Sequence, residues 1–360
     1  MKQILAPLAF VAAAAGPMAA QGLGETSVIT GPQYVNYKIG SGTGEKTVTQ
    51  LSVPIAFIFP LTERFSLDIS TSYADSRVSA AGVQSSKITG LTDTQLRANL
   101  GLFDNTAVFT LGANIATGMY KVPDAQQEAA GQIGSDFLLY PVSSMGSGNA
   151  LTGGVAIART LGEWNLGFGG SFRYSSPFDA YQVQNDVLRF EPGSESRFRV
   201  GLDRSLGEGR ISLGGTYSMF TDDKADSTTF ATGARTMGQA AIHMPTPMGD
   251  WTLSAWDLFR AEGQVIGSTS PWENISNVNL AVGFNVGSFF VQPSAEGRFW
   301  MRDGEKAGMV GSGGVRFRFD LAGLSVNPSV TYSTGNVYPA GSVTSIDVSG
   351  IRGSLLIRLR

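Results

Sequence analysis

The sequence contains no cysteine among its 360 residues and only one histidine, His243. The absence of cysteine excludes a disulfide scaffold, thiolate-based zinc sites and thiol nucleophiles. A single histidine cannot build a multi-histidine metal centre, and we predict neither a metal nor a cofactor. Charged residues make up only 15% of the chain and the formal net charge is −3, which argues against a nucleic-acid-binding protein.

Long hydrophobic runs are also lacking beyond the N-terminal region. No later segment approaches the roughly 18 consecutive apolar residues of a membrane-spanning helix. The N-terminal region combines Lys2 with an apolar run over residues 4–15 and then small residues, which is typical of a secretory signal peptide. We therefore predict a signal peptide over residues 1–20 and a single domain over residues 21–360.

Glycine and period-two alternation are abundant. Glycine supplies 46 of the 360 residues, well above its usual share of about 7%. Bulky apolar residues alternate with small or polar ones over residues 164–174, 278–286 and 324–333, among other stretches. This period is the signature of a strand with one apolar face, and its recurrence predicts an all-β protein.

The connections between these stretches alternate between short and long. Short turns are expected at Pro60–Arg64, Asp104-Asn105, Gly162-Glu163, Gly207–Gly209, Pro245–Asp250, Gly287-Ser288 and Ala322-Gly323, with longer polar loops between them. Counting the segments gives 14–16 strands of roughly 9–12 residues, the length that a tilted strand needs to cross a bilayer. The pattern predicts a transmembrane antiparallel up-and-down β-barrel in the outer membrane of a Gram-negative bacterium, with the short turns in the periplasm.

A soluble periplasmic β-protein is the alternative, since it would also show alternation. Aromatic residues favour the membrane barrel, because they gather at the expected strand ends as in the interfacial girdles of such barrels.

The least regular segments are residues 27–37, 132–146 and 251–260. In the last of these Asp257 falls on the apolar face, which predicts a β-bulge.

The face opposite the apolar stripe carries the charged residues, and arginine outnumbers lysine there. The predicted pore-lining residues are Arg97, Arg173, Glu195, Arg197, Arg199, Asp203, Arg210, Glu296, Arg298, Arg316, Arg318 and Asp320. Guanidinium groups bind carboxylates with fixed bidentate geometry. These residues either form an arginine-bearing lumen that favours anions, or they form arginine–acid ladders that stiffen the wall.

Two loops have competing interpretations. The longest loop, residues 118–146, contains the apolar run Phe137-Leu138-Leu139-Tyr140 and either folds into the barrel or extends the next strand. The acids Asp222, Asp223 and Asp226 either form a solvated loop tip or bridge divalent cations to lipopolysaccharide.

The one histidine offers no catalytic site. His243 falls near a periplasmic turn in this topology, and no nucleophile or acid is identifiable as its partner. We therefore predict no catalytic residues and expect that the chain is not an enzyme.

Four strings carry a resemblance to a known family: TVTQLSVPIAFIFPLTERFSLDIS, GLTDTQLRANLGLFDN, NIATG and GEWNLGFGGSFRYSSPFDAY. They resemble outer-membrane transporters of the meta-pathway phenol-degradation type, which are similar in kind to fatty-acid and aromatic-hydrocarbon channels. That family places a Gly-x-x-Asp-Thr strand start before a Pro-Thr-Gly strand end, matched here by Gly90–Thr94 and Ala116-Thr117-Gly118. Ala116 departs from the family's proline, and no ligand residue can be carried over.

The resemblance implies a channel for passive uptake of small hydrophobic or aromatic solutes. The residues alone leave two alternatives open, a general diffusion porin with weak anion preference and a loop-plugged structural or surface-binding barrel. The partners expected are outer-membrane lipid, lipopolysaccharide and small solutes, for a monomer or a homotrimer.

Overall fold

The computed structural model describes residues 26–183, 186–265 and 268–360. The predicted signal peptide lies outside the described residues. Within these ranges strands dominate, and no helix has the length and apolar character to cross a membrane.

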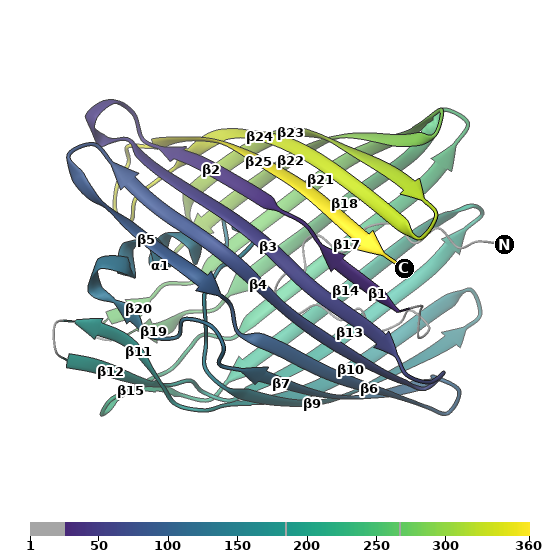
Figure 1. Cartoon of the computed structure of the whole chain (residues 1–360), viewed down its shortest axis with the longest axis horizontal. Helices are drawn as coiled ribbons and strands as arrows, with labels where there is room; N and C mark the ends of the chain where they lie inside the picture. Colours follow the sequence, from purple (N-terminus) through teal and green to yellow (C-terminus); the bar gives the residue numbers. More distant parts are fainter. Residues whose placement is uncertain (1–25, 184–185, 266–267) are drawn as a thin grey trace.

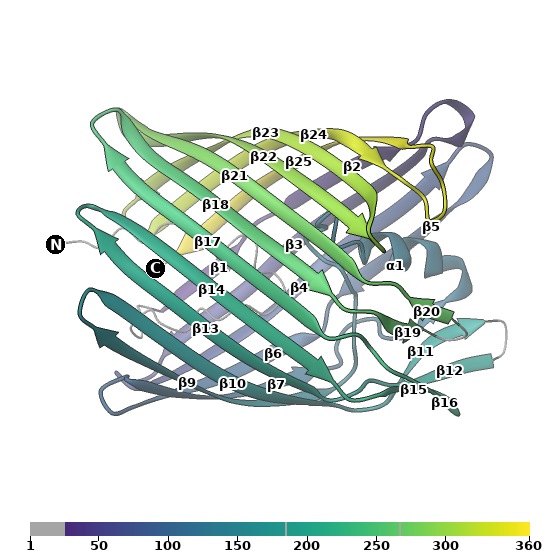
Figure 2. The same ribbon diagram turned by 180° about the vertical axis from the view of Figure 1, so that it is seen from behind.

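The wall of the molecule is one antiparallel sheet that closes on itself (Figures 1 and 2). Eighteen segments form it, and two wall strands are each divided into two segments, so the described residues build sixteen wall strands. In wall order they are β1 (Ser27–Thr30) with β2 (Gln33–Ile39), β3 (Lys46–Pro60), β4 (Phe65–Ala80), β5 (Val83–Leu91) with β6 (Thr94–Leu102), β7 (Ala107–Ile115), β9 (Ala150–Leu161), β10 (Trp164–Ser175), β13 (Glu195–Leu206), β14 (Gly209–Phe220), β17 (Arg235–Thr246), β18 (Gly249–Arg260), β21 (Glu273–Val286), β22 (Phe289–Arg302), β23 (Glu305–Leu321), β24 (Leu324–Val337) and β25 (Ile346–Leu359).

The first wall strand closes the barrel against the last. β25 pairs with β1 and with β2, and both of these also pair with β3. The break between β1 and β2 falls at Gly31-Pro32, where a side chain on Gly31 would overlap the carbonyl oxygen of Leu355. Proline cannot donate to the ladder, which explains why pairing is interrupted there and resumes at once.

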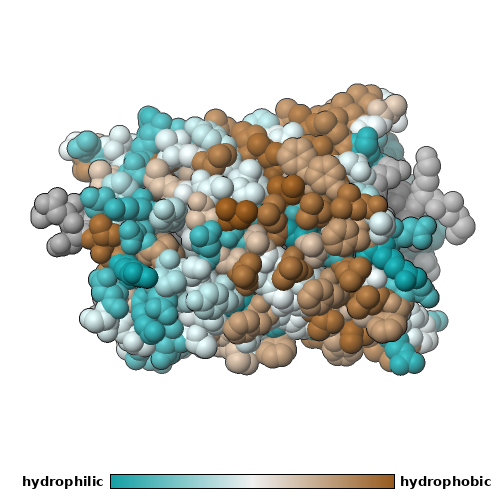
Figure 3. Space-filling view, turned by 60° about the horizontal axis from the view of Figure 1, so that its bottom comes forward, coloured by the Kyte–Doolittle hydropathy of each residue, from teal (hydrophilic) through white to brown (hydrophobic). Residues whose placement is uncertain are grey.

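Period-two alternation gives this wall an apolar outside. Phe168, Phe172 and Phe198 point outward and are each more than half exposed. In Figure 3 the apolar atoms form a broad band, whereas polar atoms dominate the end opposite the termini. Since a closed sheet leaves no unpaired edge to face lipid, this is the architecture of a barrel in a bacterial outer membrane.

Additional structure lies at the end of the barrel opposite the C-terminus, which is the extracellular end (Figure 1). A small sheet there contains β8 (Val122–Pro123), β11 (Phe178–Val183), β12 (Asp186–Glu191), β15 (Asp223–Ala225) and β16 (Thr228–Phe230), and a hairpin joins β19 (Gly263–Val265) to β20 (Ser268–Ser270). Asp223 is buried and accepts a hydrogen bond from the backbone nitrogen of Gly193 at 2.6 Å. Asp226 accepts one from the backbone nitrogen of Arg189 at 3.1 Å. Asp223 therefore holds neighbouring loops together, whereas Asp222 and Asp226 are exposed, Asp226 in the turn between β15 and β16.

The predicted architecture is confirmed, with the strand count at sixteen. The seven periplasmic turns lie where the sequence places them. Residues 132–146 contain the end of a helix and irregular chain rather than a strand.

The predicted bulge at 251–260 is wrong. β18 keeps a continuous register with both β17 and β21, and Asp257 does lie on the outer face. Its carboxylate accepts hydrogen bonds from the Asn274 amide at 2.8 Å and the Ser276 hydroxyl at 2.6 Å. Because the neighbouring strand supplies polar partners on the same face, the chain does not need a bulge to turn this acid inward.

Candidate functional site

The longest loop folds into the barrel. Residues 116–149, which we call the internal loop, include a 3₁₀ turn η2 (Asp124–Gln126) and the helix α1 (Gln127–Ile133). Its apolar run is buried, with Phe137, Leu138 and Tyr140 each at most 5% exposed. Of the two interpretations of this loop, the structure therefore shows the one in which it enters the barrel.

The two ends of the internal loop are held by Asp93, which lies in the break between β5 and β6. Its carboxylate accepts hydrogen bonds from the backbone nitrogens of Gly118 at 3.1 Å and Ser147 at 2.6 Å, and from the Asn114 amide at 2.9 Å. Asp93 is 7% exposed. It therefore satisfies backbone donors where the chain leaves the wall and where it returns.

The two short motifs of the family resemblance meet at this point. The hydroxyls of Thr94 and Thr117 lie 2.8 Å apart, and the Thr117 hydroxyl donates to the carbonyl oxygen of Thr92 at 3.1 Å. Residues 90–94 and 116–118 thus form one anchor for the internal loop.

The middle of the loop is bound by Gln50 of β3, which is fully buried. Its amide donates to the carbonyl oxygen of Val142 at 2.8 Å and accepts from the Val142 backbone nitrogen at 2.9 Å. The same amide donates to Ser76 of β4 at 3.0 Å. A single wall side chain therefore satisfies both backbone groups of one loop residue, as a neighbouring strand would.

The tip of the loop reaches strands on another part of the wall. Arg298 of β22 is buried and donates to the carbonyl oxygen of Phe137 at 2.6 Å, while it also forms an ion pair with Glu296. The Phe137 ring stacks on Trp300 with centroids 5.3 Å apart. Arg298 therefore binds the loop to the wall, and Glu296 holds Arg298 in place.

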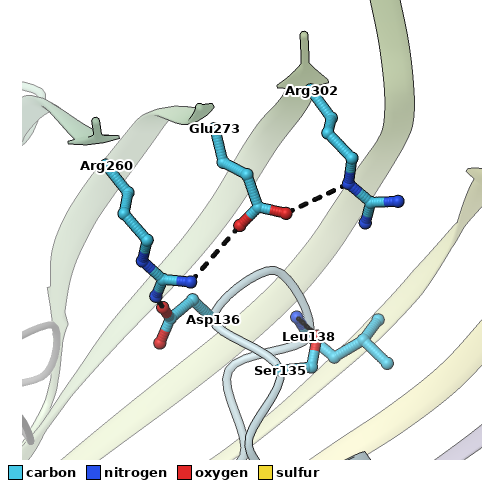
Figure 4. Close-up of polar contacts among 6 residues, drawn as sticks. All are labelled: Ser135, Asp136, Leu138, Arg260, Glu273 and Arg302. Atoms are coloured by element: carbon cyan, nitrogen blue, oxygen red, sulfur yellow. Dashed lines mark hydrogen bonds and ion pairs between the residues drawn. The ribbon is translucent and has the colours of Figure 1, made fainter. Parts of the chain in front are cut away.

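A chain of ion pairs continues from the tip along the extracellular mouth (Figure 4). Asp136 of the loop lies 2.5 Å from Arg260, the last residue of β18. Glu273 of β21 binds Arg260 at 3.4 Å and Arg302 of β22 at 3.1 Å. Alternating charges on three successive strands thus fix the loop tip against the wall.

Two cavities lie between the internal loop and this part of the wall. The first, of about 230 Å³, is bounded by the loop and by the extracellular ends of β2, β22, β24 and β25. The second, of about 240 Å³, contains Asp136, Arg260 and Glu273 in its lining. Phe137 and Trp300 form the partition, since both belong to the lining of each cavity.

The register places the twelve sequence-derived site residues on the interior face of the wall, the face of Gln50 and Arg298. Arg173 is opposite Glu195, and β13 carries Arg197 and Arg199 on the same face. Nearer the periplasm, Arg97 pairs with Asp68 at 3.0 Å, Arg210 binds Asp203, and Arg318 pairs with Asp320 at 3.0 Å. Arg316 donates to Gln292.

Sequence reasoning missed several interior charges. The register adds Arg235, Arg260, Arg302, Arg352, Arg358 and Glu273 to the interior face. The alternation of the last strand would have found Arg352 and Arg358. The others occupy the first or last position of a strand, where alternation does not show whether a side chain points into or out of the barrel.

Four arginines gather on adjacent strands near the extracellular end, and we call Arg173, Arg197, Arg199 and Arg235 the basic strip. Glu195 pairs with Arg197 at 2.6 Å, and the register places all four guanidinium groups on the interior face. Arg235 is the register partner of Arg260, which pairs with Asp136 of the internal loop. One end of the basic strip therefore lies beside the tip of the internal loop.

His243 lies on the interior face opposite Arg210, and its Nδ1 is 3.2 Å from the Thr252 hydroxyl. Among the residues that the structure describes, no group of acids and histidine has the arrangement of a metal site.

Neither known protein families nor curated proteins match this sequence. Solved structures match in fold. OprB of Pseudomonas putida is 10% identical, with 93% of each chain covered and a TM-score of 0.48. An outer membrane channel from Pseudomonas putida F1 is 13% identical, with 96% of this chain and 99% of that chain covered and a TM-score of 0.40. OmpT, an outer membrane protein of Vibrio cholerae, is 9% identical, with 93% and 98% covered and a TM-score of 0.45.

The fold is that of a bacterial outer-membrane β-barrel. It rests on the closed sixteen-strand wall of the described residues and on the apolar exterior.

The prediction that the chain is not an enzyme requires correction. OmpT is among the proteins that share the fold, at 9% identity, and a barrel shared at this level of identity does not separate catalytic from non-catalytic outer-membrane proteins. The exclusion of an enzyme is therefore withdrawn.

Proposed function

We propose that this protein is an outer-membrane channel through which small anionic solutes diffuse. The observation that carries the proposal is the basic strip, one end of which lies beside the tip of the internal loop. A solute that passes the loop tip travels between the loop and a wall that carries these arginines.

The size of the barrel supports an aqueous path. A barrel of sixteen strands is wider than side chains can fill, unlike one of eight strands. The internal loop is attached to β3, β18 and β22 by Gln50, Arg260 and Arg298. Because these attachments fix the loop against the wall, it narrows the bore to a passage with defined walls.

The interior chemistry supports anions rather than uncharged apolar solutes. The ion pairs Arg97–Asp68 and Arg210–Asp203 continue the charged lining toward the periplasm. An apolar solute gains nothing from such a wall, whereas an anion exchanges water for guanidinium donors. The general channel with anion preference thus fits the interior better than the uptake of neutral hydrophobic compounds.

The test is the reversal potential of the purified barrel in a planar bilayer under a salt gradient. We expect open steps with anion preference, and we expect the triple variant Arg173→Gln, Arg199→Gln, Arg235→Gln to bring the permeability ratio of anion to cation close to one. The matched control is Arg204→Gln, since Arg204 lies on the outer face and pairs with Glu163. Cation preference in the wild type, or an unchanged ratio in the triple variant, would contradict the proposal.

A further inference from the structure

The cavity of about 230 Å³ lies at the entrance of the bore, and we call it the mouth cavity. Its walls come from the internal loop and from the extracellular ends of four wall strands. A solute arriving from outside therefore meets this cavity at the extracellular end of the bore.

Most of the mouth cavity is apolar. Phe137 and Trp300, whose rings stack on each other, line it together with Leu138, Ile39 and Val348. An apolar cavity of about 150 Å³ is large enough to hold benzene. The mouth cavity therefore has room for a single aromatic ring and a small substituent.

The only charged residue in the lining of this cavity is Arg302, among the residues that the structure describes. Its Nε donates to Glu273 at 3.1 Å, and its guanidinium lies 4.4 Å from the centre of the Trp300 ring. In the described part of the chain its two terminal nitrogens donate no hydrogen bond, and they point away from Glu273 (Figure 4). Glu273 and Trp300 thus fix the guanidinium plane while leaving the pair of donors that a carboxylate takes.

The neighbouring cavity provides a contrast in charge. Asp136, Glu273 and Arg260 belong to its lining, and both carboxylates already bind the Arg260 guanidinium, so this cavity offers an anion two negative charges and a donor group that is occupied. An anionic ligand is therefore directed to the side of the Phe137–Trp300 partition where Arg302 is the only charge.

From these contacts we propose that the mouth cavity binds small monocyclic aromatic carboxylates, with the ring against Phe137, Trp300 and Leu138 and the carboxylate on Arg302. The proposal rests on the proposed function, because it names one class of anion that the channel admits. Binding at the mouth raises the local concentration of such solutes at the extracellular end of the bore.

The first experiment compares three ligands on the wild-type barrel in detergent by titration calorimetry. Benzoate carries both ring and charge, benzyl alcohol carries the ring alone, and acetate carries the charge alone. We expect benzoate to bind at least about tenfold more tightly than either, the change that corresponds to about 1.4 kcal/mol. Equal binding of benzoate and acetate, or of benzoate and benzyl alcohol, would overturn the proposal without recourse to any variant.

The second experiment uses variants whose folding is checked by heat-modifiable migration. Arg302→Gln should weaken benzoate binding about tenfold or more and leave benzyl alcohol unchanged, whereas Ile39→Trp, which fills the cavity, should weaken both. The matched control is Arg77→Gln on the outer face of β4, which should leave all three ligands unchanged. An unchanged benzoate affinity in both Arg302→Gln and Ile39→Trp contradicts the proposal.

The two proposals fail separately. A barrel that conducts anions without binding benzoate removes the site and keeps the channel. A barrel that binds benzoate through Arg302 but shows no open steps removes the channel and keeps the site.

Discussion

At the residue scale, the buried carboxylate of Asp93 fixes the position of the internal loop. It accepts from two backbone nitrogens that lie 29 residues apart, those of Gly118 and Ser147. A carboxylate offers about four lone-pair sites to hydrogen-bond donors. Its removal leaves buried donors without partners, which is costlier than the loss of an exposed contact.

We expect Asp93→Asn to loosen both ends of the loop while the barrel stays closed. The cost is about 1–3 kcal/mol for each buried donor left without an acceptor. Limited proteolysis should cleave the variant between residues 118 and 147 faster than the wild type. Asp104→Asn, in an exposed periplasmic turn, serves as the control and should not change the cleavage rate.

Gly118 is the second residue on which this anchor depends. A methyl group there would overlap the carbonyl oxygen of Met145 and lie 2.7 Å from the backbone nitrogen of Asp93. Gly118→Ala should therefore reproduce the proteolysis seen for Asp93→Asn. Gly153→Ala, at a site where a methyl group meets no atom within 4 Å, should behave as the wild type. Equal protection of both alanine variants would show that the close approach at Gly118 is not required.

Tyr140 gives the loop a pH dependence. Burial, with a smaller contribution from Tyr37, raises the pKa of the Tyr140 hydroxyl above its usual value of 10.0. The folded state therefore favours the neutral hydroxyl. The free energy of unfolding keeps its full value below about pH 10 and falls as the pH rises above it, because the hydroxyl then ionises more readily in the unfolded state. We expect the loop to become susceptible to proteolysis above that pH in the wild type.

The matched variant is Tyr140→Phe. The Tyr140 hydroxyl is buried and has no hydrogen-bond partner in the described structure, so its removal costs little. The variant should lose the alkaline transition of the loop, and a titration at 295 nm should show one fewer tyrosine ionising late. Retention of the alkaline transition in Tyr140→Phe would assign it to another group.

At the element scale, the strands were accessible from the sequence and the contacts of the loop were not. Alternation and turn residues identify a strand and its inner face from neighbours along the chain. The hydrogen bond from Arg298 to Phe137 joins residues 161 apart, and no local pattern pairs them. The same limit explains the error at Asp257, where the polar partners Asn274 and Ser276 belong to the next strand.

The candidate site divides in the same way. Alternation predicted the inner face of the residues in the middle of strands, such as Arg97 and Arg199. It did not identify Arg260 and Arg302, because each is the last residue of its strand. The mouth cavity needs the loop and four strands together, so the sequence held no signal for it.

At the scale of the whole molecule, the wall and the internal loop are separable. The sixteen wall strands pair through their own backbone groups, and the loop contacts them through side chains. Replacing residues 121–144 with a short glycine–serine linker should leave a folded barrel with larger conductance and weaker ion selectivity. Shortening the extracellular loop over residues 340–343, which lie outside the lining of the mouth cavity, is the control and should leave the conductance unchanged. A smaller conductance after removal of the internal loop would show that it does not occupy the conducting path.

The two sets of loop contacts also imply an order of assembly. Gln50, Ser86 and Lys46 bind the loop from strands that precede it in the chain, whereas Arg260 and Arg298 bind it from strands that follow. A growing sheet can thus hold the loop on its concave side before the later strands arrive, since closing the shorter chain segments costs less entropy. The last seam to form, between β25 and the first wall strand, then closes around a loop already in place. In this order the later strands pack against a loop that is already in position, so the shape of the passage is set during folding.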